Sequence, residues 1–246
     1  MITEKNTNTL NPNQMAAVEC TEGPVMIIAG PGSGKTRVIT ERISYLIKEG
    51  VSPNNILALT FTNKAAKEMR QRVHAITKNN ASYSIWMGTF HSIFAKILRI
   101  ESHIIGYTNN FTIYDNEDSQ KIIKRIVKDR NLDREIYNAK YLFSKISIMK
   151  NQLIDSKKYS ENDELIKNDR INKREEFVKI YRDYCNSCKD SNCMDFDDLL
   201  INTHRLFKEN SEILKQYQSL FKYILIDEYQ DTNKVQDSII KQIGKK

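Results

Sequence analysis

The feature that most constrains the fold is a glycine-rich turn between an apolar run and a helical pattern. Residues 29–36 read Ala-Gly-Pro-Gly-Ser-Gly-Lys-Thr, which matches the phosphate-binding pattern G-x-x-x-x-G-K-[ST] except that alanine replaces the first glycine. Glycines let backbone N–H groups converge on phosphate oxygens without a Cβ in the way. We expect the preceding residues 24–29 to form a buried strand, and the helix after the turn to end at Gly50. This context favours a nucleotide-binding α/β protein over a plain glycine-rich turn.

The chemistry of a nucleoside triphosphate explains the residue types in this turn and near the C-terminus. We expect Lys35 to reach the β- and γ-phosphates and the Thr36 hydroxyl to bind Mg²⁺. A second metal-binding carboxylate should follow a neighbouring strand, and Asp227 directly follows the apolar residues 223–226. Glu228 would then orient and deprotonate the attacking water. A solvated strand end is the alternative for this acidic pair.

Turn-forming residues divide the chain unevenly. All four prolines lie at or before residue 53, and no glycine occurs between residues 106 and 244. We therefore expect an α/β beginning and a mostly helical continuation. Asn63 and Asp115 are the predicted N-caps of two of the helices.

Short apolar runs predict the remaining strands. They lie at residues 56–61, 83–88, 222–226 and, as a short one, 111–115. Strands that alternate with helices predict a parallel sheet with helices on both faces. About 100 residues of charged amphipathic helices interrupt this pattern and predict a helical subdomain inserted into one α/β core.

Charge and hydropathy bound the partners and the compartment. The net charge is +7, and residues 121–150 hold nine Lys or Arg against three Asp or Glu. This excess suits a polyanionic partner, and a solvated helical face explains it equally well. The longest apolar run has five residues, from Val25 to Ala29, whereas a transmembrane helix needs about 20. The polar N-terminus lacks the pattern of a signal peptide, so we expect a cytoplasmic protein without a membrane partner.

Three of the four cysteines form a C-x2-C-x4-C pattern. These are Cys185, Cys188 and Cys193, with His204 eleven residues further on. A structural zinc site would need a second ligand pair at workable spacing, which this pattern lacks. Reduced thiols without zinc are therefore expected.

Six motifs occur in one order along the chain. They are LNPNQ at 10–14, AGPGSGKTR at 29–37, LALTFTNKAAKEM at 57–69, GTFHS at 88–92, MDFDDLL at 194–200 and LIDEYQDTN at 225–233. Together they resemble the N-terminal motor region of UvrD/PcrA/Rep-type superfamily 1 DNA helicases. The resemblance implies a RecA-like P-loop sheet formed by residues 1–105 and 194–246, with the inserted subdomain at 106–193. It also implies ATP and Mg²⁺ as cofactors and single-stranded or tailed DNA as partner.

The resemblance gives roles to matching residues. Gln14 would read the adenine edge, Arg37 would pack on the base, and Gln230 would link hydrolysis to DNA movement. The other nucleotide-binding positions are Ala29, Gly30, Pro31, Gly32, Ser33, Gly34, Lys35 and Thr36. The implied DNA contacts are Phe61, Thr62, Asn63, Thr89, Phe90 and His91. Packing in the core is the alternative for Phe61, Phe90 and His91, and a capped helix start is the alternative for the MDFDDLL motif.

Two functions of different classes stay open. The first is the ATP-hydrolysing part of a 3′-to-5′ DNA helicase, with its polarity taken only from the resemblance. The second is a module that binds single-stranded DNA or docks a partner and carries a vestigial nucleotide site. A small-molecule kinase would need neither LNPNQ nor TFTNKA. The repair or replication pathway stays open as well.

Helicases of this kind also carry a G-D-x-x-Q-S-I-Y motif and a second motor domain, both C-terminal to the six motifs. No segment here resembles the G-D-x-x-Q-S-I-Y motif, and no second motor domain is recognised. We therefore expect this chain alone to hydrolyse ATP slowly and to unwind nothing. A separate chain that carries the second motor domain is a candidate partner.

Overall fold

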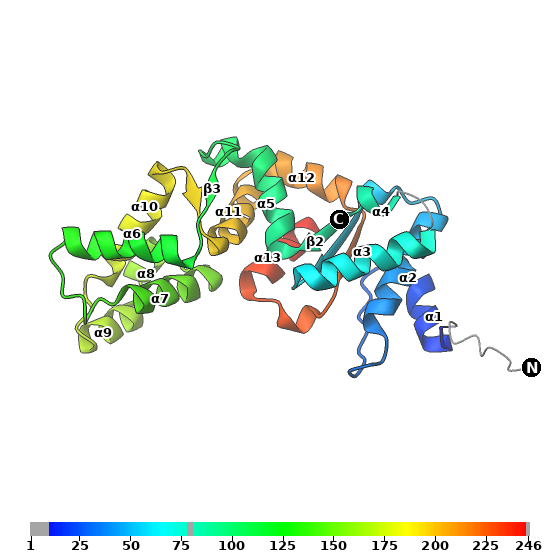
Figure 1. Ribbon diagram of the computed structural model, residues 1–246, viewed down its shortest axis with the longest axis horizontal. Helices are drawn as coiled ribbons and strands as arrows, with labels where there is room; N and C mark the ends of the chain where they lie inside the picture. The colour runs from blue at the N-terminus through cyan, green and yellow to red at the C-terminus, as the bar shows by residue number, and fades with distance from the viewer. Residues whose placement is uncertain (1–9, 78–80, 245–246) are drawn as a thin grey trace, which may run out of the picture. The chain divides into compact units, whose positions relative to one another are not determined.

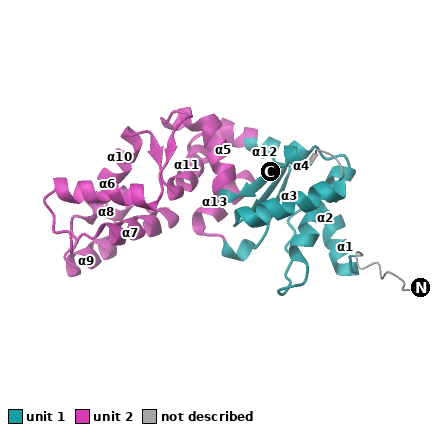
Figure 2. Ribbon diagram, in the orientation of Figure 1, with its two compact units in different colours: residues 1–90, 217–231 teal, residues 91–216, 232–246 magenta. Residues whose placement is uncertain are grey.

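The computed structural model describes residues 10–77 and 81–244, which form a mixed α/β protein that is mostly helical (Figure 1). Its contacts divide the chain into two compact units (Figure 2). Unit 1 comprises residues 1–90 and 217–231, and unit 2 comprises residues 91–216 and 232–246. The functional division into a motor domain with an insertion at 106–193 stays a prediction, because compactness alone does not define a motor domain.

Unit 1 is built on a parallel sheet of three strands in the order β2-β1-β5. The strands are β1 (Ile56–Thr60), β2 (Trp86–Thr89) and β5 (Tyr223–Ile226). The helices are α1 (Pro12–Glu19), α2 (Lys35–Lys48), α3 (Asn63–Thr77) and α4 (Ala81–Ser84). Ala58 of β1 pairs with Met87 on one side and with Leu225 on the other. The predicted parallel pairing and the predicted strands near 56–61 and 222–226 are confirmed.

The central strand β1 is buried along its whole length. Ile56 and Ala58 pack in one cluster with Ile43 of α2 and Val73 of α3. Leu57 and Leu59 point to the opposite face, because side chains alternate along a strand, and they are buried as well. A strand that is buried on both faces needs a continuous apolar sequence, which explains why Ile-Leu-Ala-Leu predicts it well.

The predicted strand at residues 24–29 is wrong. These residues form an irregular segment, and Val25, Met26, Ile27 and Ile28 are 39%, 78%, 36% and 89% exposed. An apolar run reports hydrophobicity, but a buried parallel strand also needs a hydrogen-bonded neighbour and helices that cover it. The described strands of the sheet pair with one another without this segment.

The exposed run from Val25 to Ile28 is expected to promote self-association, because contiguous apolar surface favours aggregation. Changing both Met26→Lys and Ile28→Lys should reduce concentration-dependent association, measured by light scattering behind size exclusion. The free energy of unfolding should change by less than about 0.5 kcal/mol, as for exposed positions in general. Ile43→Ala is the control, since Ile43 is fully buried and its truncation should cost about 2–5 kcal/mol. If the double variant lost a similar free energy of unfolding, the side chains of Met26 and Ile28 would be buried rather than exposed.

Two boundaries of unit 1 differ from the predictions. β2 begins at Trp86 rather than at residue 83, because residues 81–84 form the short helix α4. The predicted N-cap at Asn63 is also wrong. The hydroxyl of Thr62 accepts the N–H of Ala65 at 3.1 Å, so Thr62 caps α3 and Asn63 is its first helical residue. Gly50 follows α2 with φ +89°, as predicted for the residue after the C-cap.

The rest of the chain, most of it in unit 2, is helical with one small parallel sheet. The sheet pairs β3 (Thr112–Ile113) with β4 (Cys193–Met194). The helices are α5 (Phe90–Glu101), α6 (Asn116–Asp129), α7 (Ala139–Asn151), α8 (Ser156–Ser160), α9 (Asp163–Ile171), α10 (Phe177–Asp190), α11 (Phe196–Glu209), α12 (Ser211–Leu220) and α13 (Lys234–Ile243). Within the described chain, no helix has both the length and the apolar character that a bilayer crossing requires.

Unit 2 has its own core, formed mainly by α6, α7 and α10. The apolar face of α6 is buried, and its predicted N-cap is confirmed at Asp115, whose carboxylate accepts the N–H groups of Glu117 and Asp118. Cys188 and Cys193 lie inside this core. Burial raises the pKa of the Cys185 thiol to about 12, which keeps it protonated. No group of His, Cys, Asp and Glu side chains among residues 10–77 and 81–244 is arranged to hold a metal ion by itself.

A buried cation joins α7 to the first turn of α11. The Lys150 ammonium lies 2.7 Å from Asp195 and 2.6 Å from Asp198, and the Lys150 side chain is 3% exposed. Burial opposes the charge of Lys150, but the two carboxylates outweigh it and raise its pKa. Burial and the neighbouring Asp195 raise the pKa of Asp198 to about 6. Neither the apolar pattern nor the capping pattern of the sequence predicts this ion cluster.

Candidate nucleotide and DNA site

The glycine-rich turn has the shape of an anion cradle. Gly32 and Gly34 adopt φ of +74° and +87°, which a side chain would disfavour. The turn is closed by Ser33, whose N–H and hydroxyl both donate to the carbonyl oxygen of Gly30, at 3.3 and 2.6 Å. The N-cap Gly34 brings no side-chain hydrogen bond to the first turn of α2. The first N–H groups of α2 and its positive end are thus suited to a phosphate.

Lys35 folds over this turn. Its ammonium donates to the carbonyl oxygens of Ala29 at 3.0 Å and of Gly30 at 3.3 Å. These carbonyls hold the cation beside the cradle. A phosphate at the cradle would replace weaker neutral acceptors by a charged one.

The hydroxyl of Thr36 meets the acidic pair across unit 1. Thr36 Oγ1 donates to Asp227 Oδ2 at 3.4 Å, although 191 residues separate them in the sequence. The N–H of Asp227 donates to Leu59 O at 2.9 Å and so extends the pairing of β5 with β1 beyond Ile226. The sheet therefore fixes the carboxylate next to the start of α2.

Asp227 is a carboxylate in an unfavourable place. The residue is buried, with 5% exposure. Burial raises its pKa, and the neighbouring Glu228 raises it further, while Thr36 and Lys35 partly offset the rise. A buried oxygen ligand beside a second carboxylate is the kind of group that a divalent cation stabilises.

Glu228 and Gln230 form a local pair after β5. Glu228 has φ +52°, a left-handed conformation that is uncommon for a residue with a side chain. Gln230 Nε2 donates to Glu228 Oε2 at 2.5 Å. The predicted water-activating carboxylate and the predicted coupling residue thus lie in direct contact.

Gln14 is tied to the same turn. Its Nε2 donates to Ser33 O at 3.0 Å, and its Oε1 accepts the N–H of Asn11 at 2.9 Å. Both ends of the amide are therefore engaged, and reading an adenine would require Gln14 to exchange at least one bond. Arg37 lies half-buried in the first turn of α2.

The predicted DNA contacts of unit 1 follow the carboxyl ends of β1 and β2. Thr60 pairs with Thr89 at these ends, and the rings of Phe61 and Phe90 lie 5.4 Å apart. Phe90 is 1% exposed, so its ring packs in the core, which is the alternative left open by the sequence. Phe61 is half-buried, and the residues after it, Thr62 and Asn63, are exposed.

His91 belongs to unit 2, where its ring meets the ring of Phe196 edge-on at 6.0 Å. Burial lowers the pKa of His91 and Asp197 partly opposes this, which favours a neutral imidazole at pH 7.

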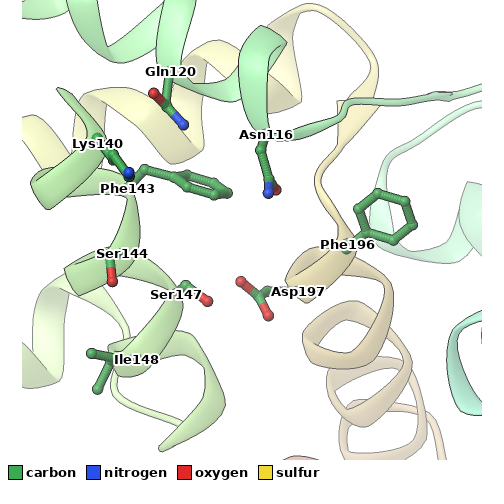
Figure 3. Close-up of a pocket in the computed structure, with 9 residues that line it drawn as sticks. All are labelled: Asn116, Gln120, Lys140, Phe143, Ser144, Ser147, Ile148, Phe196 and Asp197. Atoms are coloured by element: carbon green, nitrogen blue, oxygen red, sulfur yellow. The ribbon is translucent and has the colours of Figure 1, made fainter. Parts of the chain in front are cut away.

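Phe196 and Asp197 line a pocket of about 400 Å³ in unit 2. Its wall comes from the starts of α6 and α11 and from α7, and Figure 3 shows Phe143 reaching toward Asn116 and Asp197 pointing toward Ser147. The lining residues are Asn116, Gln120, Lys140, Phe143, Ser144, Ser147, Ile148, Phe196 and Asp197. Sequence reasoning missed this pocket. Phe196 is 49% exposed, whereas Met194, Leu199 and Leu200 of the same motif are buried, and the sequence alone does not show this difference.

Comparison with known proteins decides the family. Residues 10–246 match the UvrD/REP helicase N-terminal domain. The chain belongs to this family. The resemblance predicted from the six motifs is therefore confirmed, and the match to the UvrD/REP domain covers both the glycine-rich turn and the pocket of unit 2.

Individual UvrD/REP relatives are similar over nearly the whole chain. It is 46% identical over 238 residues to a probable DNA helicase II homolog of Mycoplasma capricolum, which covers 94% of this chain and 32% of that protein. It is 42% identical over 243 residues to the ATP-dependent DNA helicase PcrA of Bacillus subtilis, covering 96% of this chain and 31% of PcrA. The same identity is found for PcrA of Staphylococcus aureus, with 97% and 32% covered. The chain thus spans about a third of the length of these relatives.

Proposed function

We propose that the chain is the ATP-binding and ATP-hydrolysing motor region of a 3′-to-5′ DNA helicase. In this proposal the sheet of unit 1 is a RecA-like nucleotide-binding core. The observation that carries it is the approach of Thr36 Oγ1 to Asp227 Oδ2 at 3.4 Å, which joins the phosphate-binding turn to the acidic pair. Membership of the UvrD/REP family supports it.

The residues fit Mg·ATP. A hydroxyl and a buried carboxylate offer the oxygen ligands that Mg²⁺ prefers, and the turn offers N–H groups to phosphate. Bound Mg²⁺ would neutralise charge on the β- and γ-phosphates. Lys35 would exchange the carbonyl oxygens of Ala29 and Gly30 for phosphate oxygens. Glu228, oriented by Gln230, would take the proton of the attacking water.

Single-stranded DNA is the proposed partner. The Phe61 ring offers a face on which any base stacks, and the hydroxyl of Thr62 and the amide of Asn63 can hold phosphates without reading sequence. In unit 2 we propose a second contact at the pocket beside His91 and Phe196. Further parts of this proposal are a cytoplasmic location and a second motor domain as partner.

A second candidate function is a DNA-binding or partner-docking module with a vestigial nucleotide site. The exposure of Thr62 and Asn63 beside the half-buried Phe61 favours it, because this surface could contact DNA without any nucleotide.

ATPase measurements with and without oligo-dT separate the two candidates, using the wild type and Lys35→Ala. Stimulation by DNA that disappears in Lys35→Ala supports the motor region. Salt-sensitive DNA binding without hydrolysis in either protein supports the module. The thermal unfolding midpoint of both proteins serves as the control for correct folding.

A further inference from the structure

A line of side-chain hydrogen bonds runs from the pocket of unit 2 to the first turn of α13. Asn151 Nδ2, at the end of α7, donates to Asp197 Oδ1 at 2.8 Å. Asn151 Oδ1 accepts from Asn233 Nδ2 at 2.7 Å. Asn233 Oδ1 in turn accepts the N–H of Gln236 at 2.9 Å and caps α13. All four residues belong to unit 2.

The charge on Asp197 sets the direction of this line. An ionised carboxylate only accepts hydrogen bonds, so the amide of Asn151 must turn its N–H group toward it. The side-chain carbonyl of Asn151 then faces Asn233, so Asn233 must donate its Nδ2–H to it. The side-chain oxygen of Asn233 is thereby left to accept the N–H of Gln236 and cap α13. The line thus runs from a negative charge to the positive end of α13, and each bond polarises the next.

Both ends of the line lie at places with proposed functions. Asp197 lines the pocket together with Ser147, and Asn151 also donates to the carbonyl oxygen of Ser147 at 2.9 Å. Asn233 stands two residues after the acidic segment 227–231 in the sequence. A ligand that donates a hydrogen bond to the Asp197 carboxylate would compete with the Nδ2–H of Asn151. The hydrogen bond between Asn151 and Asn233, the N-cap of α13, would then be weakened.

We propose that Asn151 is a positioning residue that links occupancy of the pocket to the start of α13, and through the chain to the acidic segment before it. This inference rests on the proposed function, in which the pocket contacts DNA and the segment serves Mg·ATP. Linkage then requires that DNA changes nucleotide affinity and that nucleotide changes DNA affinity by the same factor.

Asn172 provides the matched control. Like Asn151, it donates to the carbonyl oxygen four residues earlier, that of Asn168, at 2.7 Å. It lies at the C-cap of α9 and is exposed. Asn172→Ala therefore removes the same local bond without removing the line to α13.

Hydrogen exchange of the ligand-free chain tests the structural half of the inference. In Asn151→Ala the amides of Gln236 and Asp237 should exchange roughly fivefold faster than in the wild type, because the cap loses its fixed orientation. Asn172→Ala should leave them unchanged. Unchanged exchange in Asn151→Ala, or an equal rise in Asn172→Ala, would overturn the link.

Binding of a non-hydrolysable ATP analogue with Mg²⁺, with and without oligo-dT, tests the functional half. In the wild type, DNA should change the nucleotide Kd about fivefold or more. In Asn151→Ala this factor should fall below about twofold, while the Kd without DNA stays within about twofold of the wild type. Wild-type coupling that persists in Asn151→Ala, or no coupling in the wild type, overturns the inference. A wild type that binds neither ligand overturns the proposed function instead, and the exchange comparison then decides the Asn151 link alone.

Discussion

Replacing Lys150 by methionine is expected to lower the free energy of unfolding by about 3–5 kcal/mol. Methionine keeps a similar length, so the change removes the ammonium with little loss of packing. The carboxylates of Asp195 and Asp198, now 2.7 and 2.6 Å from that ammonium, would remain buried without a cation. Urea denaturation followed by circular dichroism measures the loss as a lower midpoint at unchanged slope.

The pH dependence identifies charge as the cause. Without the cation, the pKa of both carboxyls should rise, and a carboxyl whose native pKa is raised adds stability as the pH falls through that pKa. The variant should therefore recover part of its lost stability between pH 7 and pH 5. Lys179→Met is the control, since the Lys179 side chain is 57% exposed and its ion pair with Glu176 should contribute at most about 1 kcal/mol. An equal loss at every pH would point to packing rather than to buried charge.

Replacing Asp227 by asparagine is expected to weaken Mg²⁺-dependent nucleotide binding by roughly 10- to 100-fold. Asparagine retains an oxygen that can accept the Thr36 hydroxyl but loses the charge that the metal ion requires. The unfolding midpoint of the free protein should stay equal or rise, because a buried charge beside Glu228 is removed. Titration with a fluorescent ATP analogue, with Mg²⁺ and with EDTA, separates the metal-dependent part.

Protonation of Asp227 should affect the stability of the free protein and its affinity for Mg²⁺ in opposite directions. Its raised pKa means that the free wild type gains stability as the pH falls through it, whereas Mg²⁺ binding weakens over the same range. In Asp227→Asn, the contribution of residue 227 to both pH dependences, that of stability and that of Mg²⁺ binding, should be absent. If Mg·nucleotide affinity in Asp227→Asn matched the wild type at pH 7.5, Asp227 would not serve the metal ion.

How far the sequence predicts this structure depends on what each pattern encodes. Ile56–Thr60 is recognisable because both faces of β1 are buried, and Asp115 because an N-cap depends only on its local chain. Residues 24–29 look similar to β1 but lack a neighbour in the sheet, and periodicity carries no information about pairing partners. The Lys150 cluster joins distant segments and escaped prediction for the same reason.

Some features of the candidate site could be predicted from the sequence, and others depend on contacts that form only in the folded chain. The proximity of Thr36 and Asp227 was predictable, because a phosphate-binding turn requires a second carboxylate at the end of a neighbouring strand. The hydrogen bonds of Lys35 and Gln14 to the turn were not predictable, since they depend on which backbone oxygens the folded turn presents. The pocket beside Phe196 escaped because its wall comes from three helices that are far apart in the sequence.

The irregular, exposed run at Val25–Ile28 also bears on the energetics of the glycine-rich turn next to it. The glycine-rich turn is followed by the helix α2. It is preceded by the segment Val25–Ile28, with which no strand of the described sheet pairs. Any conformational freedom that this segment lost when a ligand bound would cost entropy, which is subtracted from the affinity. A change that immobilises Val25–Ile28 should therefore raise the affinity for phosphate, even though these residues do not contact the phosphate.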